Sequence, residues 1–440
     1  MLHSRKGIGV EVRVLYDLSY ASRGLSGIPS DTRSIARMLS TIFGSNCDFI
    51  IFPKSYVPRP RRSSLSPIGQ ATYSGSALRA NSGRSYLPSS ISSILLIIQS
   101  ISFIRAVPVF KLDRITSKSA FNFLLLPNLS ATNLRVATLS NGPRFARPKV
   151  LKCFKVKTKG YNYFIQQQID PIAVSRNTKH VVRLHDFLPI THPQFFDPIA
   201  VKAFQYGLET MLKNKEIIWV FDTKATSTEF LQLFGTDRTV HVIPCEVGSN
   251  FKEDIEIQVK DENLAVVLNT IEPRKNVLKV IEAFKFAKLA QKLPQDYKLA
   301  ILGSKGWQEE SLNLKLVKRG FGHDVIFKDS PSGDEIADVL RRGKILISAS
   351  SAEGFGLPPL EGMLFGCIPV VSDIPQHREN LGSHGIFFGE SKSELIDALI
   401  EGHAKASIST VQDLKVLRSY VHKNFSSLHI SQLWKKLLVT

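Results

Sequence analysis

Several motifs that would settle the chemistry of this sequence are missing from it. There is no DxD triad for holding a divalent metal, no GxxxxGK[ST] phosphate loop and no GxGxxG run after a predicted strand. The four cysteines have the spacing of neither a zinc site nor a redox motif, which favours reduced, buried thiols in a cytoplasmic protein. The sequence therefore indicates chemistry that needs no bound metal and no cofactor.

Long apolar runs are also missing. The most apolar stretch, residues 95–104, is interrupted by Gln99, Ser100 and Ser102 and falls well short of the ~20 residues of a membrane span. The first residues run directly into a predicted strand and lack the apolar core of a signal peptide. We therefore expect no membrane-spanning helix and, from the length of 440 residues, two domains.

Acidic residues are scarce in the first part of the chain. Residues 1–160 hold 24 Lys and Arg against 5 Asp and Glu, whereas residues 161–440 hold 33 of each. The net charge of +19 therefore lies entirely in the first part and indicates an acidic partner: membrane headgroups, a phosphorylated substrate or nucleic acid. No nucleic-acid-binding motif is present, so we expect no nucleic-acid partner. Residues 53–90, which are rich in Pro, Ser, Arg and Gly and contain no acid, predict a long mobile loop.

The most informative stretch is residues 344–373. Two apolar runs, Lys344–Ala349 and Ile368–Ser372, predict strands on either side of a loop and a helix. Pro358 and Pro359 are typical of a helix start, because a first turn leaves its amides unpaired in any case. A strand–loop–helix–strand unit implies a parallel sheet.

The loop of this unit has the features of a site for a nucleotide diphosphate carrying a sugar. Gly354 and Gly356 leave bare backbone amides beside the positive end of the helix, which favours an anion. Glu353 in the loop and Glu361, expected in the first helical turn, supply carboxylates for hydroxyl groups. An ordinary turn with two solvated glutamates is the alternative for the glutamate pair alone.

The run EGFGLPPLEG, followed by GCIPVVSD, resembles the signature of the GT4-type retaining glycosyltransferases. The resemblance implies an α/β protein with the GT-B fold: two Rossmann-like parallel-sheet domains that face each other across a cleft, with a C-terminal helix that crosses back to the first domain. We expect the first domain at 1–250, a linker at 251–262, the nucleotide-sugar domain at 263–420 and the crossing helix at 421–440.

Arg274 and Lys275 precede a predicted helix whose apolar residues fall on one face, so that two cations and a helix N-terminus converge. The family has its phosphate-binding lysine at the position of Lys275. The family's arginine five residues earlier is Thr270 here, and the glycine before it is Asn269. Two solvated cations are the alternative interpretation.

His185, in the run HDFLP after a predicted strand, matches the family's histidine that bonds the donor sugar, and Asp186 is a candidate to orient its ring. Gly27 matches a glycine that lies near the donor diphosphate in the family; a plain turn glycine is the alternative. In the run FDTKATSTEF, Asp222 stands where relatives usually have serine.

The resemblance implies a hexosyltransferase that moves a sugar, mannose as the first candidate, from a nucleotide diphosphate such as GDP-mannose to a carbohydrate or lipid-linked acceptor. Polysaccharide or lipopolysaccharide biosynthesis is the expected setting. Three alternatives stay open: a sugar-nucleotide epimerase of the same fold, a non-catalytic binding remnant and a nucleic-acid-binding protein.

The basic first part is either a solvated surface or a dock at the inner face of the plasma membrane. The expected catalytic residues are His185, Lys275 and Glu353, and the expected donor-binding residues are Gly27, Arg274, Lys275, Gly354, Phe355, Gly356, Leu357 and Glu361.

Overall fold

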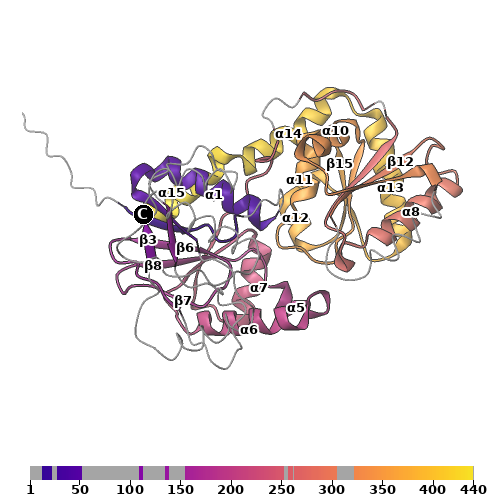
Figure 1. The fold of residues 1–440 in the computed structure, drawn as a ribbon. Coiled ribbons are helices and arrows are strands. Elements are labelled where there is room, and N and C mark those ends of the chain that lie inside the picture. The colour runs from indigo at the N-terminus through magenta and orange to yellow at the C-terminus, as the bar shows by residue number, and fades with distance from the viewer. Residues whose placement is uncertain are drawn as a thin grey trace, which may run out of the picture.

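Figure 1 shows the chain as a computed structural model in which two α/β domains lie next to each other. The structure describes residues 12–21, 27–51, 109–111, 134–137, 154–251, 256–260, 262–304 and 322–439. The predicted basic loop at 53–90, the predicted helix at 91–104 and the predicted strand at 121–126 lie outside the described residues.

The second domain contains a six-stranded sheet in which every pair of neighbouring strands is parallel. The strands, in spatial order, are β13 (Val325–Asp329), β12 (Lys298–Gly303), β11 (Leu264–Leu268), β14 (Ile345–Ser348), β15 (Ile368–Ser372) and β16 (Ile386–Phe388). The helices of this part are α8 (Val277–Leu289), α10 (Gly333–Arg342), α11 (Leu357–Leu364), α12 (Pro375–Leu381), α13 (Lys392–Ile408) and α14 (Val411–Phe425).

The first domain contains an eight-stranded sheet that is parallel except at one edge, where β3 runs antiparallel to β4. The strands, in spatial order, are β10 (Thr239–Val242), β9 (Ile218–Phe221), β8 (Lys179–Arg183), β6 (Tyr163–Gln167), β1 (Val14–Asp17), β2 (Cys47–Ile51), β4 (Leu134–Ala137) and β3 (Val109–Lys111). A separate pair is formed by β5 (Phe154–Lys155) and β7 (Ile172–Ala173). The described helices are α1 (Ile28–Phe43), α5 (Leu188–Thr191), α6 (Pro198–Leu212) and α7 (Lys224–Phe234).

The predicted two-domain α/β fold is confirmed. The sequence pattern of α8 shows why it forms: Val277, Val280, Ile281, Phe284 and Ala287 recur at helical spacing and are all buried. The short strands β11, which is all apolar, and β14, which is apolar except for Ser348, are buried on both faces. The domain boundaries given above stay predictions.

The last helix, α15 (Ser427–Val439), returns from the second domain to the first, as predicted. Figure 1 shows it beside α1, and its buried face, Ile430, Trp434 and Leu438, belongs to the core of the first domain. Packing this face against the first domain ties the two ends of the described chain together. Among the described residues, no helix combines the length and apolarity that crossing a bilayer requires.

Candidate active site

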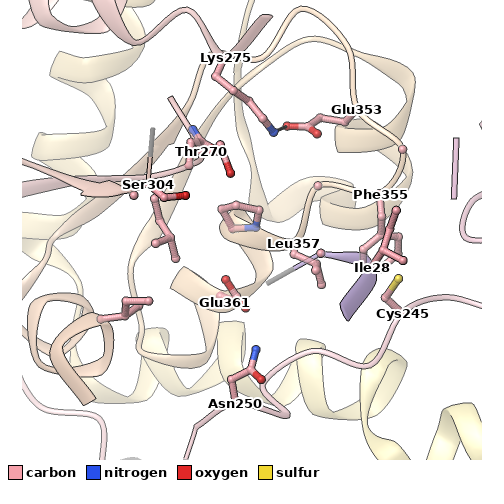
Figure 2. A pocket seen from close by; sticks show the side chains of 18 of the residues that line it. Ile28, Cys245, Asn250, Thr270, Lys275, Ser304, Glu353, Phe355, Leu357 and Glu361 are labelled. Atoms are coloured by element: carbon pink, nitrogen blue, oxygen red, sulfur yellow. Dashed lines mark hydrogen bonds and ion pairs between the residues drawn. The ribbon is translucent and has the colours of Figure 1, made fainter. Parts of the chain in front are cut away.

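A cavity of about 650 Å³ lies between the two domains. Its floor is built by the residues that follow the carboxyl ends of β11, β12, β13 and β14, the edge at which parallel sheets bind ligands. The volume is that of a site for a small molecule. Figure 2 shows side chains of both domains around this space. All of the expected site residues line it: Gly27, His185, Arg274, Lys275, Glu353, Gly354, Phe355, Gly356, Leu357 and Glu361.

The two predicted cations, Arg274 and Lys275, share one carboxylate. The Lys275 ammonium donates to Glu353 Oε1, and Arg274 Nη1 donates to Glu353 Oε2 at 3.1 Å and to the Ala352 carbonyl at 3.0 Å. All three charged groups are largely buried. Burial alone would raise the pKa of Glu353, but Lys275 and Arg274 outweigh it and hold that pKa well below its usual range. Glu353 is therefore ionised and neutralises much of the positive charge at this end of the cavity.

The turn that carries these cations is fixed by Asn276. Its backbone is left-handed, with φ of 50°, and its side-chain amide donates to the Ala349 carbonyl and to Ser351 Oγ, both at 2.8 Å. The Ser351 amide in turn donates to the Arg274 carbonyl at 2.8 Å. The cation turn and the glutamate loop thus form one connected unit, a link that the sequence pattern did not indicate.

The glycine loop presents bare amides, as expected. Among the described residues, the amides of 354–357 donate to no protein acceptor. Gly356 is the N-cap of α11 with φ of 85°, and a Cβ there would lie 3.1 Å from the ring of His377, so conformation and space both require glycine. Pro358 and Pro359 lie in the first turn, as predicted.

Gly354 has a second role, which its position in a phosphate loop did not predict. A Cβ on Gly354 would lie only 2.6 Å from the His185 carbonyl oxygen, in the other domain. The Thr226 hydroxyl of α7 also approaches the Gly354 carbonyl at 3.5 Å. The glycine therefore lets the loop of the second domain pack directly against the first.

Glu361 lies in the second turn of α11, because the helix starts at Leu357; the prediction of a first-turn position was wrong. Its carboxylate forms no hydrogen bond or ion pair with any described residue, and it faces the cavity below Lys275 and Glu353 in Figure 2. Burial raises its pKa to about 7. A buried acceptor without a partner is costly and is suited to hydroxyl donors of a ligand.

His185 lies at the cavity wall with both ring nitrogens engaged. Nδ1 lies 2.7 Å from Asp222 Oδ2, and Nε2 lies 3.1 Å from Gln167 Oε1. The prediction that Asp186 orients the ring is wrong, since its carboxylate accepts from the Leu188 amide at 3.1 Å instead. The orienting group is Asp222, the residue that stands in place of the usual serine.

Gly27 is the N-cap of α1, and its φ of 64° favours glycine. A Cβ there would meet no atom within 4 Å, so glycine is required by the backbone and not by crowding.

Thr270 and Ser304 lie together at another side of the cavity in Figure 2. The side-chain amide of Asn269 is buried. The backbone carbonyl oxygen of Asn269 would lie 1.7 Å from a Cβ on Gly303.

One cluster near the cavity has the composition of a metal site: Asp31, His185 and Cys245. The Arg183 guanidinium already occupies its centre, since it donates to Asp31 at 2.7 Å and 3.0 Å and to Cys245 Sγ at 3.4 Å. A metal ion would have to displace this buried cation, so the donor set does not fit a metal.

The domains are also joined by Glu379 of α12, which sequence analysis missed. Its carboxylate accepts from the Lys224 amide at 2.7 Å and from the Ala225 amide at 2.9 Å, at the start of α7 in the other domain. The first turn of α7 has no acidic residue of its own. The second domain thus supplies the negative charge that a helix N-terminus favours.

Residues 250–406 match the family described as glycosyl transferases group 1. The second domain is thus similar to glycosyl transferases group 1 over most of its length. This domain carries the paired cations, the glycine loop and both glutamates of the cavity.

Curated relatives of the chain include mannosyltransferases. The chain is 25% identical over 238 residues to the serotype-specific mannosyltransferase WbdA of Escherichia coli, covering 50% of this chain and 29% of WbdA. It is 23% identical over 252 residues to the O-antigen chain mannosyltransferase B of Escherichia coli, covering 55% and 63%. The alignments thus span less than two thirds of the length of these relatives.

Solved structures show the same fold over nearly the whole chain. Sucrose-phosphate synthase from Thermosynechococcus elongatus superposes with a TM-score of 0.60 at 13% identity, covering 97% of this chain and 99% of that one. WaaG, a glycosyltransferase involved in lipopolysaccharide biosynthesis, superposes with a TM-score of 0.54 at 12% identity and the same coverage. At these identities the likeness establishes the GT-B fold and no more.

Proposed function

We propose that the chain is a retaining glycosyltransferase that moves a hexose from a nucleotide diphosphate sugar to a carbohydrate or lipid-linked acceptor. The observation that carries the proposal is the cavity between the domains, where two cations and four free amides face an unpartnered Glu361 carboxylate. These are the groups that a diphosphate and a ribose require. The family match of the second domain supports the reaction class.

Charge builds on the leaving phosphate as the bond to the sugar breaks. Lys275, Arg274 and the amides of residues 354–357 are placed to stabilise that charge, which is the usual source of the largest rate gain. Glu353 faces the sugar side, and Glu361 binds the nucleotide ribose. Among the described residues that line the cavity, none stands out as a covalent nucleophile, so the acceptor attacks from the face that the diphosphate leaves.

Mannose is the first candidate for the sugar and GDP for the carrier. The supporting finding is that WbdA and the O-antigen chain mannosyltransferase B are named as mannosyltransferases. A structural neighbour, HepE from Anabaena, was solved with UDP and glucose, so UDP is the competing carrier. An O-antigen or related glycan on a lipid at the cytoplasmic face of the membrane is the proposed acceptor.

The test is a thermal-shift screen against GDP, UDP, ADP and dTDP, followed by a transfer assay with the sugar nucleotide of the carrier that binds. A ligand at ~100 times its Kd stabilises a protein by about 2.7 kcal/mol. Transfer should persist in EDTA, since the cations fill the role of a metal on the diphosphate. Activity that is abolished by EDTA and restored only by Mn²⁺ would contradict the metal-free mechanism. Binding without transfer to any acceptor would favour a non-catalytic remnant, and conversion of the donor without an acceptor would favour an epimerase.

A further inference from the structure

Four ionisable side chains of the first domain form a connected cluster at the cavity wall. They come from three elements: Asp31 from α1, Arg183 and His185 from β8 and the residues just after it, and Asp222 just after β9. Each is at least nine-tenths buried. Arg183 donates twice to Asp31 and lies 2.8 Å from Asp222 Oδ1. Arg183 alone cannot balance both carboxylates, so the cluster lacks one positive charge unless His185 carries it.

The hydrogen-bond partners of His185 supply that charge. Asp222 is ionised beside Arg183 and is an acceptor only, so Nδ1 must carry a proton at 2.7 Å from it. Asp31 Oδ2 lies 3.6 Å from Nε2, a second carboxylate on the opposite side of the ring. The ring therefore lies between two carboxyl groups, and no described residue points a donor at either of its nitrogens.

The remaining partner, Gln167, also presents an acceptor to the ring. Its Nε2 donates to the Tyr16 hydroxyl at 2.6 Å, and that hydroxyl donates to the Thr32 carbonyl at 3.2 Å. This relay turns Gln167 Oε1 toward His185 Nε2, at 3.1 Å. A neutral imidazole would leave one of its nitrogens, with no proton, against an acceptor. With the Gln167 amide in this orientation, only the doubly protonated ring donates in both contacts.

We propose that Asp222 is a positioning residue that keeps His185 as an imidazolium at the cavity wall. The ring then acts on the donor as a fixed positive charge, and neither nitrogen is free to bond the sugar. The consequence for transfer rests on the proposed function, whereas the protonation state does not. Burial alone would lower the pKa of His185, but Asp222 and Asp31 outweigh burial and raise it.

Besides burial, one charged group near the ring opposes its protonation. The charged and titratable groups that face it or its partners are Asp31, Asp222, Arg183, Cys245, Tyr16 and Asp186. Of these, Arg183 is the group that lowers the pKa of His185, and it is itself paired with both carboxylates. Burial raises the pKa of the Cys245 thiol, so it adds no charge near neutral pH.

The direct test is the ring ¹⁵N spectrum of the full chain labelled at histidine and assigned by comparison with His185→Gln. We expect both nitrogens of His185 to be protonated at pH 7, and a shift to the neutral form only above its ordinary titration range. In Asp222→Asn the pKa of His185 should fall by about 1–3 units, the usual effect of one nearby opposite charge. Asp48→Asn, which removes another buried carboxylate of the same domain, should leave this titration unchanged.

The kinetic test is the alkaline limb of kcat/KM for transfer, which should move to lower pH in Asp222→Asn and Asp222→Ser by the same amount as the NMR titration. A merely structural role would lower activity without moving this limb. A neutral His185 ring in the wild-type chain at pH 7 overturns the inference, whether or not the Asp222 variants fold. An imidazolium in a chain that transfers no sugar would leave the inference standing and defeat the proposed function instead.

Discussion

The Lys275 ammonium and the Glu353 carboxylate form a buried ion pair where a diphosphate is expected to bind, and Arg274 contacts the other carboxylate oxygen at 3.1 Å. A carboxylate and a phosphate offer the same kind of oxygen to a cation. Glu353 therefore serves as the anion of the unliganded site, and a donor diphosphate must share or replace it. This relationship gives the two glutamates of the cavity separable roles.

Lys275→Ala should lower kcat for transfer more than it raises KM for the donor. The negative charge on the leaving phosphate grows in the transition state, where the loss of one stabilising group typically costs ~10²–10³ in rate. Steady-state kinetics with the sugar nucleotide identified by the binding screen provide the measurement. The matched control is Lys279→Ala, since Lys279 lies on α8 and donates to the Glu390 carbonyl outside the cavity. Turnover like that of the wild type in Lys275→Ala would refute the assignment.

Glu353→Gln should damage transfer without weakening the binding of the free nucleoside diphosphate. Removing its charge frees Lys275 and Arg274 for the phosphates, so we expect equal or tighter binding of the diphosphate. Glu361→Gln should weaken the same binding, because it removes the ionised acceptor for the ribose. Calorimetry with the diphosphate alone separates the two variants, and equal losses of affinity would contradict the division of roles.

Much of this arrangement could be predicted from sequence, because it depends on local patterns. The apolar strand β15 begins and ends where expected, and the two prolines place the start of α11. The resemblance carried by the EGFGLPPLEG run identified the loop and helix residues of the second domain that line the cavity. Glu361 was assigned to the first turn because the prolines were expected to open the helix. The helix begins one residue before them, at Leu357, which places Glu361 in the second turn.

The contacts that were missed join residues far apart in the chain. The partner of His185 is Asp222 and not the predicted Asp186. β8 and β9 are neighbours in the sheet, so the residues after their carboxyl ends meet. Glu379 contacts α7 across the domain interface, and Asn276 ties two loops of the second domain together. Spacing within one segment carries no information about such pairs, although a departure such as Asp222 for serine marks where to look.

Glu361 should release protons when the nucleotide binds near neutral pH. With a pKa of about 7 it is partly protonated in the free protein, and ribose hydroxyls that donate to it favour the ionised form. Calorimetry in buffers of different ionisation enthalpy should report release of up to about half a proton per site at pH 7. Binding to Glu361→Gln should show no release, and a wild-type signal that does not depend on buffer would contradict this role.

The same residue should make stability depend on pH. Its pKa is raised from 4.5 in the unfolded chain to about 7, so its protonated form stabilises the fold at acid pH and this contribution is lost as pH rises through that range. Each pKa unit corresponds to about 1.4 kcal/mol, so Glu361→Gln should gain up to about 3 kcal/mol over the wild type at pH 8 and little at pH 4. Denaturant unfolding of both chains at the two pH values provides the measurement.

The basic first part of the chain should bind anionic membranes. Each Lys or Arg near an anionic surface contributes about 1 kcal/mol, so a few converging residues suffice, and salt should release the protein because it screens this attraction. We expect sedimentation with anionic vesicles and none with neutral ones. Replacing Arg59, Arg61 and Arg62 with Ser should weaken this binding and spare donor affinity. The matched control replaces three exposed lysines of the second part, Lys405, Lys415 and Lys423, and removes the same charge. If the wild-type chain ignores anionic vesicles at low salt, the membrane dock is wrong and a soluble acceptor becomes the better hypothesis.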